Sequence, residues 1–201
     1  MTRLAVMRHA ATAWSAARRL QGRTDLPLSE AGRAAAARLP LPPPIDRFVR
    51  VSSPLARARE TAALLRPVAP FSIEPRLIEM DFGAWEGRTL AEIRAADGAG
   101  AARREAMGLD FRAPGGESPR EVQARLLPWL VALGGRGEDT LAVTHKAVIR
   151  ALYALATGWP MLGRPPQRLE MDRLHLLLVA PDGAVSVGSL NLPPAAATAE
   201  D

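Results

Sequence analysis

Short apolar runs alternate with amphipathic stretches along most of the chain. The apolar runs predict strands, and they lie at Leu4–Met7, Phe48–Val51, Leu141–Thr144, Leu174–Ala180 and Val185–Val187. The first three are apolar at nearly every position, as expected of strands that are buried on both faces. The Asp182-Gly183 pair between the last two runs is typical of a hairpin turn.

Helix start signals lie in the intervals between these strands. Ser29, Ser53 and Ser118 each predict an N-cap. The helix after Ser29 is expected to end near Leu39, before a proline-rich stretch. Pro54 follows Ser53 as a first helical residue, and this helix is expected to reach about Leu65.

Two further helices are predicted in the second half of the chain. Ser118-Pro119-Arg120-Glu121 is a capping box, and the helix after it places apolar residues on one face. These residues are Val122, Leu126, Trp129 and Leu133. Another helix is expected to follow Lys146 and to end near Thr157-Gly158.

Alternating strands and helices predict a layered α/β/α fold with a mainly parallel central sheet and an antiparallel edge hairpin. Residues 1–192 are expected to form one domain. The irregular, glycine-rich residues 79–116 are expected to be a small cap inserted over one end of the sheet. Residues 193–201 are expected to be a disordered tail.

Composition narrows the class of protein. The chain has 201 residues, of which 48% are hydrophobic and 23% charged, as in folded proteins. No apolar run approaches the ~20 residues of a membrane span, and no membrane partner is expected. There is no cysteine for disulfides or thiolate metal sites. Residues 1–8 lead directly into a strand instead of a secretory leader, so a cytoplasmic location is expected.

The net charge is +5, and a basic balance can indicate nucleic-acid binding. Here the arginines are scattered and aromatic residues make up 4% of the chain. Nucleic acid is therefore not an expected partner. Lys146 is the single lysine.

Polar side chains follow each of the three buried strands. Arg8-His9 follows the first, Ser52–Arg57 follows the second and His145 follows the third. Because ligands of open α/β sheets bind beyond the carboxyl ends of the strands, these side chains are expected to converge there.

The convergent groups fit a phosphate. Arg57 lies in the first turns of its predicted helix, where free N–H groups favour an anion, whereas Arg59 is about 200° further around the helix. Guanidiniums match phosphate oxygens, and a neutral imidazole can attack phosphorus to form a phosphohistidine. The leaving oxygen then needs a proton donor, for which Glu79, Asp81 and Glu86 are candidates.

Five motifs occur in one order along the chain, and they are Arg8-His9, Ser52–Ala62, Leu77–Gly87, Gly115–Ser118 and Val143–His145. From residue 1 to about residue 160, this set resembles the histidine phosphatase superfamily in its phosphoglycerate-mutase-like branch. Any one motif is weak, but all five in order are specific.

The resemblance implies a metal-independent phosphomonoester hydrolase that needs no cofactor and acts on a small phosphorylated metabolite. It implies that His9 is the phosphorylated nucleophile and that Glu79 donates the proton. Arg8, Arg57 and His145 would bind the phosphoryl group. The implied substrate-binding residues are Ser15, Gln21, Gly22, Glu117 and Lys146. A homodimer is left open.

The chain departs from the family pattern at three positions. Ala10 follows the nucleophile where glycine is usual, Ser15 replaces a phosphate-binding asparagine, and Lys146 replaces a glycine after the second histidine. Glu117 is equally explained as an acid at the start of the helix capped by Ser118. His175 matches no motif and is predicted to be a strand residue.

Two other functions are weighed against the hydrolase. A phosphoglycerate-mutase-type phosphoryl transfer uses the same residues, and Arg103-Arg104 would then retain a bisphosphate in the cap. A catalytically poor phosphoanion-binding or interaction protein would keep the fold, and Ala10 and Ser15 would be early signs of it. The intact reacting groups favour the hydrolase.

Overall fold

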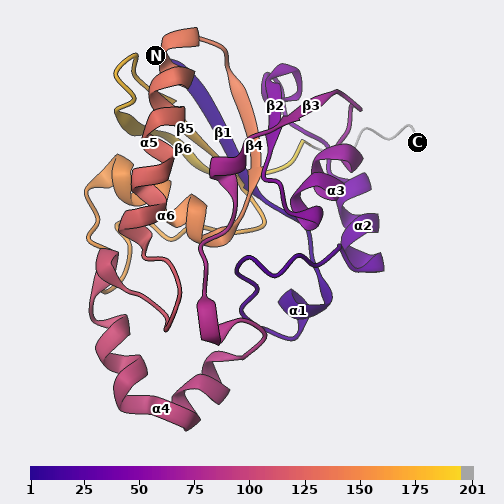
Figure 1. Cartoon of the computed structure of the whole chain (residues 1–201). Helices are drawn as coiled ribbons and strands as arrows, with labels where there is room; N and C mark the ends of the chain where they lie inside the picture. Colours follow the sequence, from indigo (N-terminus) through magenta and orange to yellow (C-terminus); the bar gives the residue numbers. More distant parts are fainter. Residues whose placement is uncertain (196–201) are drawn as a thin grey trace.

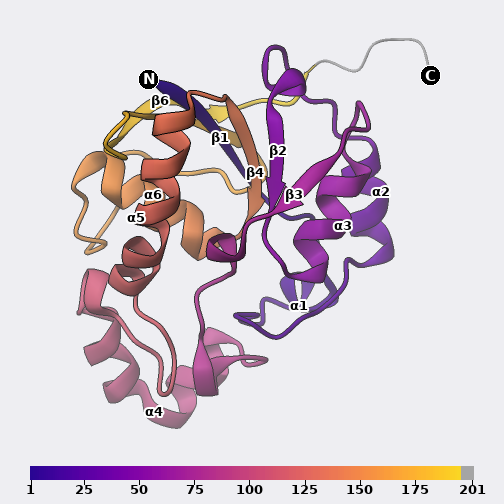
Figure 2. The same ribbon diagram turned by 45° about the horizontal axis from the view of Figure 1, so that its top comes forward.

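The computed structural model describes residues 1–195, and in it a central sheet carries helices on both faces (Figure 1 and Figure 2). Within these residues one sheet of six strands forms, and the strands are β1 (Thr2–Arg8), β2 (Val49–Ser52), β3 (Phe71–Ile73), β4 (Thr140–Thr144), β5 (Leu174–Val179) and β6 (Val185–Leu192).

The strand order across the sheet is β3-β2-β4-β1-β5-β6. The pairs β1–β4, β2–β4 and β2–β3 are parallel, whereas β5 is antiparallel to β1 and to β6. The predicted α/β fold, mainly parallel with an antiparallel edge hairpin, is therefore confirmed. The hydrophobic pattern does not predict β3, because this edge strand is three residues long and largely exposed.

The helices of the described residues are α1 (Ala13–Ala16), α2 (Glu30–Ala37), α3 (Ala56–Leu64), α4 (Leu90–Glu105), α5 (Pro119–Arg136) and α6 (Lys146–Thr157). Short 3-10 turns lie at Ile45–Arg47, Pro75–Leu77, Gly83–Trp85 and Gly108–Asp110. The predicted caps of α2 at Ser29 and of α5 at Ser118 are confirmed, and α6 ends at Gly158 in a left-handed conformation.

Alternate residues of β1 face opposite layers of the core. Leu4 and Val6 pack in the cluster that holds the buried faces of α5 and α6, whereas Ala5 and Met7 pack in the cluster that holds α3. A strand covered on both faces must be apolar at successive positions, which is the pattern of the sequence. The two layers keep water away from the centre of the sheet.

The predicted start of α3 is wrong. The helix has Leu55 as its N-cap and begins at Ala56, so Ser53 lies outside it. The hydroxyl of Ser53 accepts a hydrogen bond from the Leu55 N–H at 3.3 Å and also contacts His145. Arg57 consequently lies nearer the helix start than the serine-proline signal indicates.

Residues 79–116 are more regular than the sequence suggests. They contain α4, which begins with a capping box of Thr89 and Glu92 and is broken at Asp97. In Figure 1 this segment lies beyond the ends of α5 and α6, away from β2 and β3. That it acts as an inserted cap within one domain of residues 1–192 stays a prediction.

No helix in residues 1–195 is long and apolar enough to span a membrane. The predicted disordered tail, residues 193–201, falls largely outside the described part of the chain, since residues 196–201 are not described.

Two adjacent leucines of α5 provide a test of the core. Leu126 is fully buried, whereas Leu127 is 45% exposed. Leu126→Ala removes buried methyl groups and leaves a cavity, so it should lower the free energy of unfolding by about 2–5 kcal/mol. Leu127→Ala should change it by less than about 1 kcal/mol. Urea unfolding of both variants measures the difference, and equal losses would contradict this packing of α5.

Candidate active site

Three neighbouring strands end at one place. The register pairs Arg8 of β1 with Thr144 of β4, and Ser52 of β2 with Val143 of β4. Beyond the strand ends, the His9 N–H donates to the Thr144 carbonyl at 2.9 Å. The predicted convergence of Arg8-His9, Ser53 and His145 at the carboxyl edge of the sheet is therefore present.

The His9 side chain is held in one tautomer. Its Nδ1 lies 2.7 Å from the Ala10 carbonyl oxygen, which can only accept, so Nδ1 carries the proton and Nε2 keeps a free lone pair. The side chain is buried, and this burial, together with the charges of Arg8 and Arg57, lowers the pKa of His9 to about 3. The imidazole is thus neutral at ordinary pH, as a nucleophile must be.

His145 lies beside His9, with 5.2 Å between the ring centroids. It is fully buried, and its Nε2 lies 2.6 Å from the Ser53 hydroxyl. Its Nδ1 is buried without a hydrogen-bond partner among the described residues. Burial and the neighbouring positive groups hold the pKa of His145 well below its usual value.

Two guanidiniums complete the cluster, of which Arg57 is buried and Arg8 half-buried. Arg57 donates to the Gly22 carbonyl at 2.7 Å and to the Thr24 carbonyl at 2.9 Å. In the described residues Nε of Arg57 and Nε of Arg8 have no partner, and neither arginine forms an ion pair there. Because burial lowers the pKa of both guanidiniums, a bound anion would stabilise their charged forms.

Glu79 is the candidate acid that reaches this cluster. It is buried, and it accepts hydrogen bonds from the N–H groups of Met80 at 2.9 Å and Ala147 at 3.4 Å. Burial raises the pKa of its carboxyl, which favours the protonated form that can donate.

The two rival acids are engaged elsewhere. Asp81 caps the Gly83 N–H at 2.7 Å and lies 3.9 Å from Arg23. Glu86 accepts from the N–H groups of Arg23 and Thr24, at 2.8 and 2.9 Å. Neither residue lines the cavity that His9 and Glu79 share, so the geometry favours Glu79 as the acid.

A cavity of about 600 Å³ opens above the cluster. Of the predicted site residues, it is lined by Arg8, His9, Ser15, Gln21, Glu79 and Lys146. Residues 79–116 form one wall through apolar side chains, among them Phe82, Trp85 and Phe111.

Three predicted substrate-binding residues support the backbone of this cavity. Ser15 is bound to Thr12 in the capping box of α1, and Gln21 accepts from the Thr12 hydroxyl at 2.9 Å. Gly22 has a φ of +52°, and a Cβ on it would lie 1.7 Å from Oε1 of Glu86. Its carbonyl, as noted, holds Arg57.

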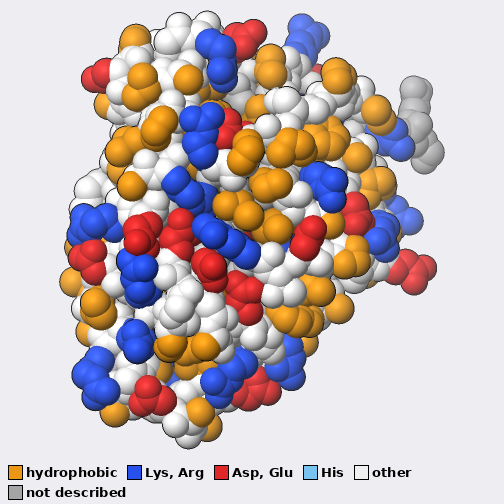
Figure 3. Space-filling view, viewed as in Figure 1, with side chains coloured by type: hydrophobic (Ala, Val, Ile, Leu, Met, Phe, Trp, Pro, Cys, Tyr) orange, Lys and Arg blue, Asp and Glu red, His pale blue; other side chains and the backbone are white. Residues whose placement is uncertain are grey.

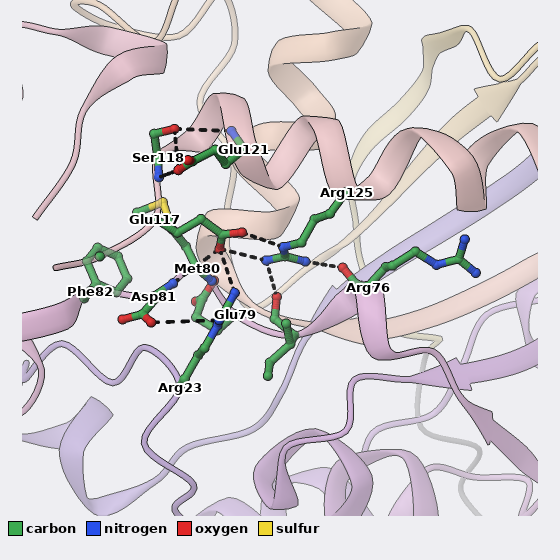
Figure 4. Close-up of polar contacts among 12 residues, drawn as sticks. Arg23, Arg76, Glu79, Met80, Asp81, Phe82, Glu117, Ser118, Glu121 and Arg125 are labelled. Atoms are coloured by element: carbon green, nitrogen blue, oxygen red, sulfur yellow. Dashed lines mark hydrogen bonds and ion pairs between the residues drawn. The ribbon is translucent and has the colours of Figure 1, made fainter.

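The structure does not bring Glu117 to the cavity. Its carboxylate pairs with Arg125 at 2.8 Å and with Arg23 at 3.4 Å, and Figure 4 shows it pointing to Arg125. Arg125 also donates to the carbonyls of Arg76 and Ile78. Glu117 therefore ties the start of α5 to the segment before Glu79, and a role on the substrate side stays a prediction.

Sequence reasoning missed several contributing residues. Ser53 carries a cap signal but binds His145 instead. Thr61 accepts from the Ala10 N–H at 3.0 Å and so supports the loop after His9. Arg150 lines the cavity one turn after Lys146, a spacing that the predicted helix already contains. Ala10 does not adopt a positive φ, so the usual glycine is not needed there.

His175 lies in β5 away from the cavity, as predicted. Residues 1–195 contain no group of three or more His, Asp or Glu side chains that could hold a metal ion.

Comparison with known proteins identifies the family. The profile of the histidine phosphatase superfamily (branch 1) matches residues 4–187. The chain belongs to this superfamily. Its predicted class, a phosphatase that acts through a phosphohistidine, is confirmed by this membership.

Individual relatives and solved structures are similar to this chain over most of its length. The glucosyl-3-phosphoglycerate phosphatase of Mycolicibacterium vanbaalenii is 40% identical over 184 residues, which cover 80% of this chain and 79% of the relative. A bifunctional protein of Mycobacterium tuberculosis is 35% identical over 94% of this chain, which spans only 54% of that protein. The structure of Bacillus stearothermophilus YhfR superposes with a TM-score of 0.78 at 31% identity, covering 96% of this chain and 98% of YhfR.

The depressed pKa of His9 predicts an acid-sensitive fold. The native imidazole stays neutral down to about pH 3, whereas the unfolded one takes up a proton near 6.5. Between these values the unfolded state binds more protons, so stability falls as pH falls. His9→Gln should reduce this slope by up to about 1.4 kcal/mol per pH unit. Urea unfolding in phosphate-free buffer measures it, and an unchanged slope would mean that native His9 protonates normally.

Proposed function

We propose that this histidine phosphatase hydrolyses a small phosphate monoester with His9 as nucleophile and Glu79 as general acid. The observation that carries the proposal is the free Nε2 of a neutral, buried His9 beside two guanidiniums without ion-pair partners. A phosphate bound beside these groups would supply the negative charge that balances the two guanidiniums.

In the first step Nε2 of His9 attacks phosphorus while the bond from phosphorus to the alcohol oxygen breaks. The protonated Glu79 carboxyl gives its proton to that oxygen, and the alcohol leaves. The buried position of Glu79 keeps the proton available at a pH where an exposed carboxyl would have lost it.

In the second step water attacks the phosphohistidine. The Glu79 carboxylate, now ionised, accepts a proton from that water, and the bond from phosphorus to Nε2 breaks. Inorganic phosphate leaves, and both residues return to their starting states. Splitting the hydrolysis in this way replaces one difficult displacement with two easier ones.

Arg8, Arg57 and His145 surround the phosphoryl group in this scheme. Their donors neutralise the oxygens on which charge collects in the transition state. Because Arg57 is held by two backbone carbonyls and His145 by the Ser53 hydroxyl, little reorganisation of these two donors is needed during the reaction. A bound phosphate also raises the pKa of both imidazoles, which favours a protonated His145.

Hydrolase activity is favoured over mutase activity by the position of the basic cap residues. A mutase must retain the phosphorylated intermediate against water. Arg103 and Arg104 do not line the cavity, and Arg104 donates to the Arg112 carbonyl at 3.0 Å. The pair is therefore not placed to hold a bisphosphate.

The substrate is proposed to be a small metabolite, and the relative named glucosyl-3-phosphoglycerate phosphatase makes phosphorylated sugar acids the first class to test. On the face shown in Figure 3, side chains of both charges are interspersed, without the continuous basic surface that suits nucleic acid. The cytoplasmic location and the homodimer stay predictions.

The proposed intermediate can be trapped. A phosphohistidine is a phosphoramidate, so protein quenched during turnover should carry a phosphoryl label that acid removes and alkali spares. His9→Ala should abolish this label and lower kcat by roughly 10³-fold or more. His175→Gln, a change at a histidine outside the cavity, should keep it. Labelling that persists in folded His9→Ala protein would disprove the assignment of the nucleophile.

The proton donor can be identified by the leaving group. An alkyl alcohol needs a proton to leave, whereas a nitrophenol leaves readily as its anion. Glu79→Gln should therefore lower hydrolysis of a glycerate phosphate by about 10²–10⁴-fold and spare much of the activity on nitrophenyl phosphate. Asp81→Asn is the matched control and should affect both substrates alike and mildly. Leaving-group dependence in Asp81→Asn alone would assign the proton to Asp81.

A further inference from the structure

One wall of the cavity carries positive charge that the phosphoryl cluster does not include. Lys146 and Arg150 lie one turn apart on α6, and both line the cavity together with His9 and Glu79. Residues four apart on a helix share a face, with about 5–6 Å between their Cβ atoms. Like charges at this spacing repel each other, so the pair carries an electrostatic cost that folding alone does not explain.

No ion pair offsets this cost in the described residues, although the Glu79 carboxylate opposes part of it at Lys146. Within residues 1–195 neither Lys146 nor Arg150 forms an ion pair, in contrast to Arg19, which lines the same cavity and pairs with Glu92 at 3.1 Å. Desolvation, followed by the charges of Arg150 and Arg8, lowers the pKa of Lys146. An anion between the two side chains would reverse both effects.

Arg150 is fixed in place by an aromatic ring. Its guanidinium carbon lies 4.8 Å from the ring centroid of Trp159, which is itself buried. This cation–π contact holds the guanidinium over the ring. The planar fork of N–H donors on a guanidinium matches the two oxygens of a carboxylate.

The distance to the reacting centre limits what can bind here. Lys146 directly follows His145, and consecutive Cα atoms are about 3.8 Å apart. Lys146 and His9 also line the same cavity, so an anion held by Lys146 and a phosphoryl group on His9 would share one cavity. The apolar side chains of residues 79–116 face the remaining space of the cavity.

We propose that Lys146 and Arg150 form a second anion subsite that recognises a carboxylate on the alcohol portion of the substrate. This inference rests on the proposed function and specifies it. The substrate would be a phosphate monoester of a short hydroxy acid, extended by a less polar group along the cap. Lys146 and Arg150 would set specificity, while His9 and Glu79 would perform the chemistry.

The test compares two esters that differ in this one group. 3-Phosphoglycerate and glycerol 3-phosphate have the same three-carbon chain and the same primary ester, but only the first has a carboxylate. The quantity measured is the ratio of kcat/KM for the two esters. Because both have the same kind of leaving oxygen, any effect of a substitution on Glu79 cancels in the ratio.

The wild-type ratio should favour 3-phosphoglycerate. Lys146→Met and Arg150→Met should each reduce it roughly 10-fold, and Lys146→Glu roughly 100-fold, since a lost charge-assisted contact becomes a repulsion. Arg103→Gln removes the same charge from an exposed position away from the cavity and should leave the ratio at its wild-type value.

Other outcomes overturn the subsite. A wild-type ratio near one, or a ratio that Lys146→Met does not change, means that no carboxylate is recognised there. A third ester, glycerol 1,3-bisphosphate, tests the alternative anion, and dependence on Lys146 for this ester alone would replace the carboxylate with a phosphate. If nitrophenyl phosphate still forms the phosphohistidine, these results refute the subsite alone. If no ester is hydrolysed and no phosphohistidine forms, the proposed function fails as well.

Discussion

The parallel pairing of β1 with β4 is the constraint on which the site depends. It sets Arg8 opposite Thr144, so that the residues just beyond them, His9 and His145, leave the sheet side by side. The hydrogen bond from the His9 N–H to the Thr144 carbonyl extends the ladder one residue past β1. A register shift of one residue would turn each side chain to the other face of the sheet, and the two imidazoles would no longer meet.

This arrangement concentrates positive charge where water is scarce. Burying Arg8 and Arg57 is costly without a counterion, and in the described residues the backbone carbonyls of Gly22 and Thr24 compensate only part of that cost for Arg57. The same desolvation keeps the two imidazoles neutral and raises the pKa of Glu79, which favours its protonated form. One physical cause, burial, therefore prepares a nucleophile, an acid and an anion site together.

Much of this site was accessible from the sequence, because its reacting residues follow strands whose apolar runs are unambiguous and end at one edge of the sheet. What the sequence could not supply were contacts between distant segments. The sequence around Ser53 predicts a helix cap, whereas in the structure its hydroxyl lies 2.6 Å from Nε2 of His145. The sequence also does not reveal that the Glu117 carboxylate pairs with Arg125 of α5. The edge strand β3 is too short and too exposed for its hydrophobic pattern to predict it.

The contact between Gly22 and Glu86 bears on how such a protein can diverge. Glu86 belongs to residues 79–116, yet it accepts hydrogen bonds from the N–H groups of Arg23 and Thr24. The loop of these two residues positions Arg57 through the carbonyls of Gly22 and Thr24. The space that Glu86 fills exists because residue 22 has no side chain. The apolar wall of the cavity, with Phe82, Trp85 and Phe111, can therefore change to suit new esters. Glu86 and Gly22 can change only together, and such a change would weaken the support of Arg57 and with it the binding of phosphate.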